Sequence, residues 1–362
     1  MQELLTYSEL SEKLLSENIN VFLVSGKSLE KTGFLGNFER ADKVKFVRFS
    51  DFSENPYLEE VAQGVKAFKE SKAKIIMAVG GGTAIDLAKL IRFYADAELT
   101  GKESEPPANI TSTNNCQLIA VPTTFGTGSE ATHFAVLYVK GKKFSVADDS
   151  ILPDFYLMDA GLAKSLPKHV KASACLDALC QAIESYWSVA KTAESQSYAL
   201  EAIKCVRLHY DAYIKDSSDE SEVSKCIAKA AHLAGKAINI TKTTAPHAIS
   251  YTLTSKFNVP HGHAVALCLR NMFLINEKKS TSEDLISSHQ DIYSALQVDD
   301  AISAKKLLDG FMMLGRLEVS LAKLGILTES DIEMVVKGVN FERLANHPVE
   351  LDYKDIVCVL TN

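Results

Sequence analysis

Four side chains in the second half of the sequence have the types and spacing of a metal centre. Asp177 and Gln181 stand four residues apart in "CLDALCQAIESYW", so both point from one face of a predicted helix. His247 follows a proline at a predicted helix start, and His261 is held between a proline and a glycine in "VPHGHA". A carboxylate on so apolar a helix needs a partner, because a lone buried charge is costly, and a divalent cation would supply one. The alternatives are a surface hydrogen bond between Asp177 and Gln181 and ordinary structural roles for the two histidines.

Two glycine-rich turns in the first half have the composition of a nucleotide site. "IIMAVGGGTAIDLAK" runs from a predicted strand through Gly80, Gly81 and Gly82 into a helix that begins near Thr83. Glycines let the backbone approach a pyrophosphate, and a helix N-terminus offers free N–H groups. "AVPTTFGTGSE", residues 120–130, opens a second strand end into hydroxyl residues and glycines. Ligands bind at such strand ends in parallel sheets, although the spacing is not the GxGxxG of an ordinary Rossmann motif. Each stretch alone has an alternative: a tight strand-to-helix turn for the first and a polar loop for the second.

The elements that must position these residues fall into two halves with different patterns. Up to about residue 160, short β-rich runs such as "INVFLVSG", "KVKFVRF" and "CQLIAVPTT" alternate with amphipathic helical segments, which predicts a parallel sheet. "FAVLYVKGKKFSV" predicts a hairpin that turns at Gly141, and "DFYLMD" predicts one more strand. From Lys168 onward, apolar residues recur at three and four positions, which predicts helices. We therefore predict an α/β domain over residues 1–164, with a polar loop at 101–115, and a helical domain over residues 165–362.

The composition excludes several classes of protein. The chain has 362 residues, is 46% hydrophobic and carries a net charge of −7. Its length and apolar content suit two cores, and its charge argues against a nucleic-acid partner, which requires a concentrated excess of Lys and Arg. No stretch approaches the roughly 18 to 20 apolar residues that span a bilayer, and the first residues lack the pattern of a secretion signal. Seven scattered cysteines form no CxxC pair, so we expect reduced thiols in a cytoplasmic protein.

Four blocks of the sequence, in this order, resemble the iron-containing (group III) alcohol dehydrogenases. The blocks are "GGGTAIDLAK", "AVPTTFGTGSE", "DALCQAIESY" and "PHAISYTLTSKFNVPHGHA", and the resemblance covers nearly the whole chain. It implies the fold that these enzymes share with dehydroquinate synthase. That fold has an N-terminal parallel-sheet dinucleotide-binding domain and a C-terminal all-helical domain, with a divalent metal in the cleft between them. The resemblance also suggests a homodimer that forms through an early strand.

The resemblance assigns site residues by motif. The metal ligands fall on Asp177, Gln181, His247 and His261. The implied contacts with the coenzyme lie at the first loop, the second loop and the ribose, and they are Gly80, Gly81, Gly82, Thr83, Asp86, Thr123, Thr124, Thr127 and Lys143. Gly26 stands where NAD-preferring relatives often carry an acid that binds the adenosine 2′-hydroxyl. Because no carboxylate repels a 2′-phosphate there, we expect NADPH to be accepted at least as readily as NADH.

Two positions depart from the family's pattern. The iron enzymes commonly have Asp-x-x-x-His where this chain has Asp177 and Gln181, so a neutral amide oxygen replaces an imidazole. We expect a lower metal affinity, with Fe²⁺ as the family's ion and Zn²⁺ or Mn²⁺ as alternatives. Gln181 could instead hold a water molecule at the metal. Many relatives place another histidine at Tyr251, which leaves Tyr251 or His263 as the candidate proton carrier. Each has a structural alternative, Tyr251 as a packed aromatic and His263 as a helix-start residue.

The resemblance implies reversible hydride transfer between NAD(P)H and an aldehyde or primary alcohol, with the metal as a Lewis acid on the carbonyl oxygen. The blocks around Gln181 and His247 look most like the phosphonoacetaldehyde reductases, which make 2-hydroxyethylphosphonate. Lys242, Thr243 and Thr244 have the charge and the N–H groups to bind a phosphonate. The alternative is that the threonines cap a helix and that the lysine is solvated.

Three other functions stay open at this point. A general short-chain alcohol or lactaldehyde dehydrogenase of the same family would act on neutral aldehydes. A cyclase of the dehydroquinate synthase type shares the architecture but needs more basic substrate contacts. Outside the enzymes, a metal-free nucleotide-binding sensor is the alternative, because Gln181 weakens the metal site.

Overall fold

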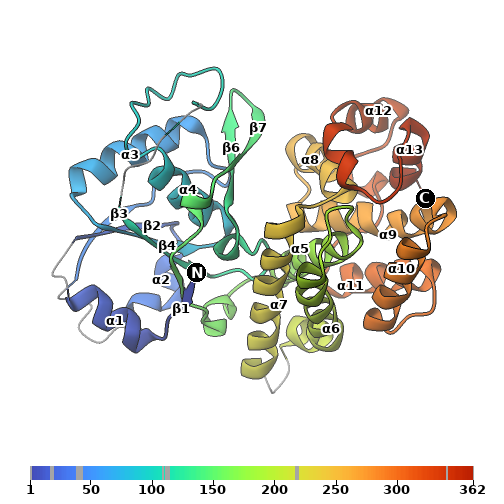
Figure 1. The fold of residues 1–362 in the computed structure, drawn as a ribbon, viewed down its shortest axis with the longest axis horizontal. Coiled ribbons are helices and arrows are strands. Elements are labelled where there is room, and N and C mark those ends of the chain that lie inside the picture. Colours follow the sequence, from blue (N-terminus) through green and yellow to red (C-terminus); the bar gives the residue numbers. More distant parts are fainter. Residues whose placement is uncertain are drawn as a thin grey trace. The chain divides into compact units, whose positions relative to one another are not determined.

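A parallel sheet and a set of packed helices occupy separate parts of the chain in the computed structural model (Figure 1). The structure describes residues 2–16, 20–37, 44–107, 110, 115–216, 220–339 and 341–361. One compact unit, the sheet unit, comprises Met1–Thr124 and Ser129–Ser165, and the other, the helical unit, comprises Phe125–Gly128 and Leu166–Asn362. The predicted fold class, an α/β half followed by a helical half, is confirmed. The predicted loop at 101–115 lies partly outside the described residues.

The sheet unit is built on six parallel strands in the order β1-β8-β5-β4-β2-β3. The strands are β1 (Glu3–Leu4), β2 (Asn20–Ser25), β3 (Lys45–Phe49), β4 (Ile75–Gly80), β5 (Gln117–Pro122) and β8 (Phe155–Tyr156). The apolar runs that predicted strands coincide with β2, β3, β4 and β5. A separate antiparallel hairpin, β6 (Phe134–Val139) and β7 (Lys142–Ala147), turns at Gly141 as predicted. Gly141 has φ +77°, which an L side chain rarely adopts.

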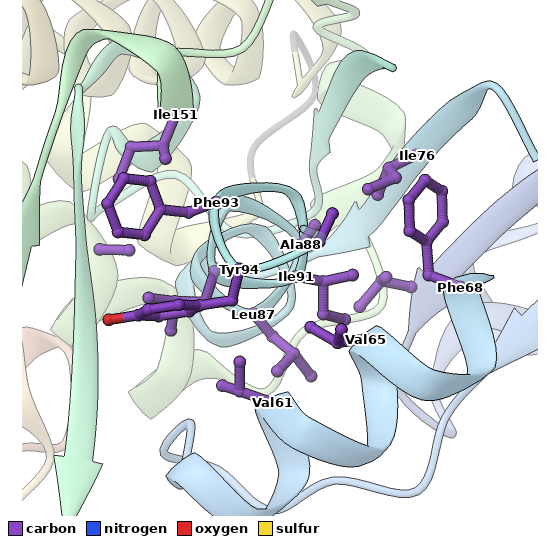
Figure 2. Packing of buried hydrophobic residues seen from close by; sticks show 14 of the residues in the cluster. Val61, Val65, Phe68, Ile76, Leu87, Ala88, Ile91, Phe93, Tyr94 and Ile151 are labelled. Atoms are coloured by element: carbon purple, nitrogen blue, oxygen red, sulfur yellow. The ribbon is translucent and has the colours of Figure 1, made fainter. Parts of the chain in front are cut away.

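Helices cover both faces of this sheet. Successive strand residues point to opposite sides, and both sets are apolar, so each face has to be buried. Phe22 and Ile76 pack on the side of α3 (Leu58–Ser71) and α4 (Gly82–Phe93). Figure 2 shows Leu87 and Ile91 of α4 facing the valines of α3 in this layer. The alternate strand residues pack in the second layer with residues of α1 (Tyr7–Ser16) and α2 (Leu29–Thr32). A sheet buried on both faces explains why its strands are almost uniformly apolar in the sequence.

The helical unit is organised around α5 (Lys168–Trp187), which packs on α6, α7 and α9 (Figure 1). The other helices are α6 (Ala193–Lys215), α7 (Glu220–Thr241), α8 (Ala245–Phe257), α9 (His261–Lys279), α10 (Glu283–Leu296), α11 (Ala301–Leu314), α12 (Glu329–Lys337) and α13 (Tyr353–Thr361). Helix α5 is buried on nearly all sides from Cys175 to Trp187. A helix buried all round must find a partner for each polar side chain that it carries. Helix α5 carries three such residues in succession along one face: Asp177, Gln181 and Glu184.

The short segment Phe125–Gly128 belongs to the helical unit, although the sequence analysis places it in the first domain. Two glycines allow this packing. A Cβ on Gly126 would lie 2.6 Å from the carbonyl oxygen of Ala174, and a Cβ on Gly128 would lie 2.6 Å from the Cα of Gly235. Gly128 also has φ +58°. The second glycine-rich loop therefore supplies residues to both units.

All seven cysteines lie within the described residues and are free thiols. Within the same part of the chain, every helix is too short or too polar to cross a bilayer.

Candidate metal centre and nucleotide loops

Three of the four predicted metal ligands converge in the helical unit. Asp177, His247 and His261 each offer one ligand atom, and these atoms all lie within 4.8 Å of one another. His247 Nε2 lies 3.3 Å from Asp177 Oδ1, and His261 Nε2 lies 3.9 Å from the same oxygen. The side chains of Asp177 and His247 are almost fully buried, whereas that of His261 is 34% exposed. The arrangement has a closed side and an open side, as a site that admits a substrate would need.

Gln181, the fourth predicted ligand, lies one helical turn after Asp177 on α5. Its Oε1 is buried and accepts no hydrogen bond from the described residues. Its Nε2 donates to the carbonyl of Thr127 at 3.4 Å, which fixes the opposite edge of the amide. A buried amide oxygen without a partner is costly, so the side chain fits a cation that the oxygen can bind. Thr127, which is predicted to contact the coenzyme, thus lies beside Gln181, a predicted metal ligand, in the helical unit.

Local structure holds each ligand in place. Asp177 and Gln181 are one turn apart on α5. His247 is the third residue of α8, after the cap residue Thr244 and a proline in the first turn. His261 is the first residue of α9, which begins directly after Pro260. Helix starts and prolines restrict the backbone, so both histidines are held rigidly, as their sequence context predicts.

Two carboxylates make the environment of His247 strongly negative. Burial alone lowers the pKa of the imidazole, but Glu184 and Asp177 outweigh burial and raise this pKa to about 9. The residues present therefore hold a positive charge at this point, and a metal ion can replace the proton. With two imidazoles and two oxygen donors, the set suits Fe²⁺, Zn²⁺ or Mn²⁺.

Glu184 is a site residue that the sequence analysis missed. Its side chain is fully buried, and Oε2 accepts a hydrogen bond from His247 Nδ1. It stands three residues after Gln181 on α5, and this spacing was the available signal because residues three and four apart share a helix face.

The two candidate proton carriers lie in different surroundings. The ring of Tyr251 is nearly parallel to that of His261, with an angle of 14° and 6.1 Å between centroids. His263 is almost fully buried, and its Nε2 lies 2.7 Å from the backbone carbonyl oxygen of Glu318. Burial lowers the pKa of His263. Tyr251 therefore lies against a predicted ligand with part of its surface exposed, whereas His263 is buried.

The predicted nucleotide loops meet at the carboxyl ends of β4 and β5. Gly81 caps α4 and Gly82 is its first residue. The backbone N–H of Thr123 donates to the carbonyl of Gly80 at 2.9 Å. A Cβ on Gly81 would lie 3.0 Å from Thr124 Oγ1. Gly81 thus leaves room for the side chain of Thr124 between the two loops, beside a helix N-terminus that can bind a phosphate.

The other predicted coenzyme contacts, Thr83, Asp86 and Lys143, have partners in the sheet unit. The hydroxyl of Thr83 donates to the carbonyl of Glu54. Asp86 accepts hydrogen bonds from Ser129 Oγ and, at 3.0 Å, from the backbone N–H of Val136. Removal from water raises the pKa of Asp86, while the charges of Lys89 and Lys143 oppose that rise. In the structure the Asp86 carboxylate therefore ties the second loop to the hairpin.

Gly26 follows β2, and a Cβ at this position would meet nothing within 4 Å. Arg48 of the neighbouring strand β3 donates to the Gly26 carbonyl at 2.6 Å and forms an ion pair with Glu30. A cationic side chain thus lies beside open space at the position predicted to face the adenosine ribose.

Family models match both halves of the chain. The family model for iron-containing alcohol dehydrogenase matches residues 4–160. The model for the C-terminal part of the Fe-containing alcohol dehydrogenase family matches residues 171–362.

Individual relatives share about a third or less of their residues with this chain. Phosphonoacetaldehyde reductase from Streptomyces viridochromogenes is 31% identical over 226 residues, which cover 60% of this chain and 57% of that protein. Aldehyde-alcohol dehydrogenase 2 from Entamoeba histolytica is 30% identical over 73% of this chain, which spans only 32% of that longer protein. The crystal structure of sulfoacetaldehyde reductase from Bifidobacterium kashiwanohense in complex with NAD⁺ superposes with a TM-score of 0.88 at 26% identity, covering 99% of this chain and 95% of that one.

Proposed function

Because this chain belongs to the iron-containing alcohol dehydrogenase family, we propose that it is a metal-dependent oxidoreductase that interconverts an aldehyde and a primary alcohol with NAD(P)H. The observation that carries the proposal is the meeting of Asp177, His247 and His261, one helical turn from Gln181. The buried amide oxygen of Gln181 has no hydrogen-bond partner within the described residues. Asp177, Gln181, His247 and His261 would hold the metal. When bound, the metal supplies a Lewis acid for the substrate oxygen and the nicotinamide supplies the hydride.

The chain's own residues bind and orient these groups. The start of α4, which Gly81 caps without a side-chain bond, offers backbone N–H groups for the pyrophosphate. The bond from the N–H of Thr123 to the Gly80 carbonyl holds the second loop beside it. Buried Asp177 and His247 close one side of the metal centre against water, while the partly exposed His261 lies on the open side. Tyr251 stacks on His261, so we assign it the proton-carrying role in preference to His263, whose Nε2 is taken up by Glu318.

The preferred substrate that we propose is phosphonoacetaldehyde. Support comes from two relatives whose names describe an acetaldehyde with an anionic phosphono or sulfo group. Of the residues that the sequence offers for the anion, Thr244 is taken up by Glu184, which accepts from both its N–H and its hydroxyl. Lys242 is exposed and Thr243 is half-buried. The anion contact therefore falls on Lys242 and Thr243.

We propose NADPH as the preferred coenzyme. Arg48 lies beside the open space at Gly26, and a 2′-phosphate there would meet a guanidinium and no acidic side chain at position 26. Planar guanidinium groups bind phosphates through paired hydrogen bonds. Glu30, which now pairs with Arg48, would be displaced by the phosphate.

Two further proposals concern the setting of the enzyme. We propose a homodimer, since β1 is an edge strand of the sheet and its Leu4 is 55% exposed. We also propose a cytoplasmic location, which suits the seven free thiols.

The test follows the oxidation of NADH and NADPH with phosphonoacetaldehyde, propanal and lactaldehyde, in the presence of Fe²⁺, Zn²⁺ or Mn²⁺. We expect NADPH-dependent reduction of phosphonoacetaldehyde that requires one of the ions. Turnover of the neutral aldehydes alone would replace this assignment with a general short-chain dehydrogenase. Binding of the nucleotide without turnover under any of the ions would identify a sensor instead.

A further inference from the structure

Glu184, which is outside the predicted ligand set, accepts four hydrogen bonds from residues at the start of α8. Its carboxylate has 0% exposure and lies in the interior of the helical unit. Oε1 accepts from the N–H of Thr244 at 2.9 Å, from the hydroxyl of Thr244 at 3.0 Å and from the N–H of His247 at 3.3 Å. Oε2 accepts from His247 Nδ1. Four hydrogens therefore point at one carboxylate.

These contacts give Glu184 two roles: it caps α8, and it fixes the ring of His247. Thr244 is the N-cap of α8 and His247 is its third residue. N–H groups at these positions have no partner within the helix. Thr244 makes no side-chain cap bond of its own, so Glu184 of α5 caps α8 instead. By occupying Nδ1 of His247, Glu184 also leaves Nε2 as the ring atom that faces Asp177, 3.3 Å away.

We propose that Glu184 is a positioning residue of the metal centre, which locks His247 as an Nε2 ligand and adds a second buried negative charge beside Asp177. Carboxylates behind histidine ligands orient the ring and raise its basicity. Two carboxylates balance the charge of a dication when the other three donors, two imidazoles and an amide, are neutral. This balance explains how the site tolerates the weak donor Gln181. The inference rests on the proposed function, because it presumes that His247 holds a metal.

Glutamine cannot replace Glu184 without loss. A carboxylate accepts all four hydrogens, whereas a glutamine amide has one accepting oxygen and an NH₂ group that donates. In Glu184→Gln, the NH₂ group faces either His247 Nδ1 or the N–H groups at the start of α8. Either orientation misplaces the imidazole, although the side chain keeps its size.

The matched control is Ser185→Ala, the next residue on α5. Ser185 is equally buried, but its hydroxyl oxygen accepts a hydrogen bond from the hydroxyl of Thr241 at 2.8 Å and forms none with the four predicted ligands. Loss of this hydroxyl removes a buried hydrogen bond from the same helix. It therefore separates an effect on the metal from a general effect on the fold.

The experiment measures Zn²⁺ affinity by competition with a chromophoric chelator and ligand geometry by the visible spectrum of the Co²⁺-loaded protein. We expect Glu184→Gln to bind Zn²⁺ about 10- to 100-fold more weakly than the wild type and to change the Co²⁺ spectrum. We expect Ser185→Ala to match the wild type in both. Thermal unfolding of the metal-free proteins shows whether each variant folds, and Glu184→Asp, which restores the charge, should recover part of the affinity.

The outcomes separate this inference from the proposed function. Wild-type affinity and an unchanged Co²⁺ spectrum in Glu184→Gln would overturn the positioning role and leave the metal-dependent function standing. An equal loss of affinity in Ser185→Ala and Glu184→Gln would also overturn it. A wild-type protein that binds neither ion would overturn the proposed function, and the inference with it.

Discussion

Gly262 and Ser173 bring the helices α9 and α5 into backbone contact. A Cβ on Gly262 would lie 2.0 Å from the carbonyl oxygen of Ser173 and 2.7 Å from the Cβ of Asp177. The contact places the first residue of α9, His261, next to Asp177 on α5. The glycine after the histidine is therefore part of the geometry that assembles the metal centre.

The first prediction concerns this contact. Gly262→Ala should push the start of α9 away from α5, lower the free energy of unfolding by about 1–3 kcal/mol and weaken metal binding. Denaturant unfolding and chelator competition measure the two effects. The control is Gly310→Ala on α11, where a Cβ meets nothing within 4 Å, and the added methyl should raise helix stability by up to about 1 kcal/mol. Equal behaviour of the two variants would show that the close contact has no role in placing His261.

The second prediction concerns Gln181. In Gln181→His an imidazole replaces the amide oxygen, and we expect Zn²⁺ to bind at least tenfold more tightly, a gain of about 1.4 kcal/mol. Gln181→Leu, which keeps much of the volume but removes the oxygen, should weaken binding. Chelator competition at fixed pH compares the variants with the wild type. If Gln181→Leu keeps the wild-type affinity, the amide does not hold the ion.

The third prediction concerns Arg48. Loss of its guanidinium in Arg48→Ala should weaken NADPH binding by roughly 10- to 100-fold, since a hydrogen bond to a charged group contributes about 1.5–3 kcal/mol. NADH lacks the 2′-phosphate, so its dissociation constant serves as the internal control and should stay nearly constant. Titrations that follow nucleotide fluorescence give both constants. An equal loss for the two coenzymes would remove Arg48 from the recognition of the phosphate.

The fourth prediction concerns the stability of the metal-free protein in acid. Burial, and to a lesser degree His289, lowers the pKa of His347 from 6.5 to about 3. His347 therefore stays neutral in the folded protein while the unfolded chain takes up a proton below pH 6.5. The contribution of the neutral imidazole to the free energy of unfolding is therefore fully present above pH 6.5. It is lost as the pH falls toward the pKa that His347 has in the folded protein.

The pH dependence of the free energy of unfolding tests whether His347 is the group that titrates. Between pH 4 and 6, one such group changes the free energy of unfolding by about 1.4 kcal/mol per pH unit. His347→Gln should remove this share of the slope, and denaturant unfolding at several pH values measures it. Burial and the charge of Lys191 lower the pKa of His289 to about 4. His289 therefore adds to the same pH dependence, and the His347→Gln variant keeps this contribution. An unchanged slope in His347→Gln would show that His347 is not the group that titrates.

The sequence predicted those parts of the site that depend on local spacing. Asp177 and Gln181 share a helix face, His247 and His261 stand at helix starts, and the apolar runs form the strands. Such features follow from the 3.6-residue period of helices and from the backbone limits of proline and glycine.

The parts that the sequence left open depend on packing between distant segments. Spacing put Glu184 on the same face as Gln181, but nothing local shows that the first turn of α8 packs against it. Thr127 belongs to a nucleotide-like loop in the sequence, and its position beside Gln181 requires Gly126 and Gly128 to pack against α5 and α7. Long-range contacts of this kind decide which polar side chain meets which partner.

We predict that one dication binds where Asp177, His247 and His261 meet, with Gln181 as its fourth ligand. After removal of metal with a chelator and back-titration, elemental analysis of the wild type should find one ion per chain. The same analysis should find almost none in His247→Ala or His261→Ala, and both variants should lose turnover. Retention of the metal and of full activity in both alanine variants would contradict the account.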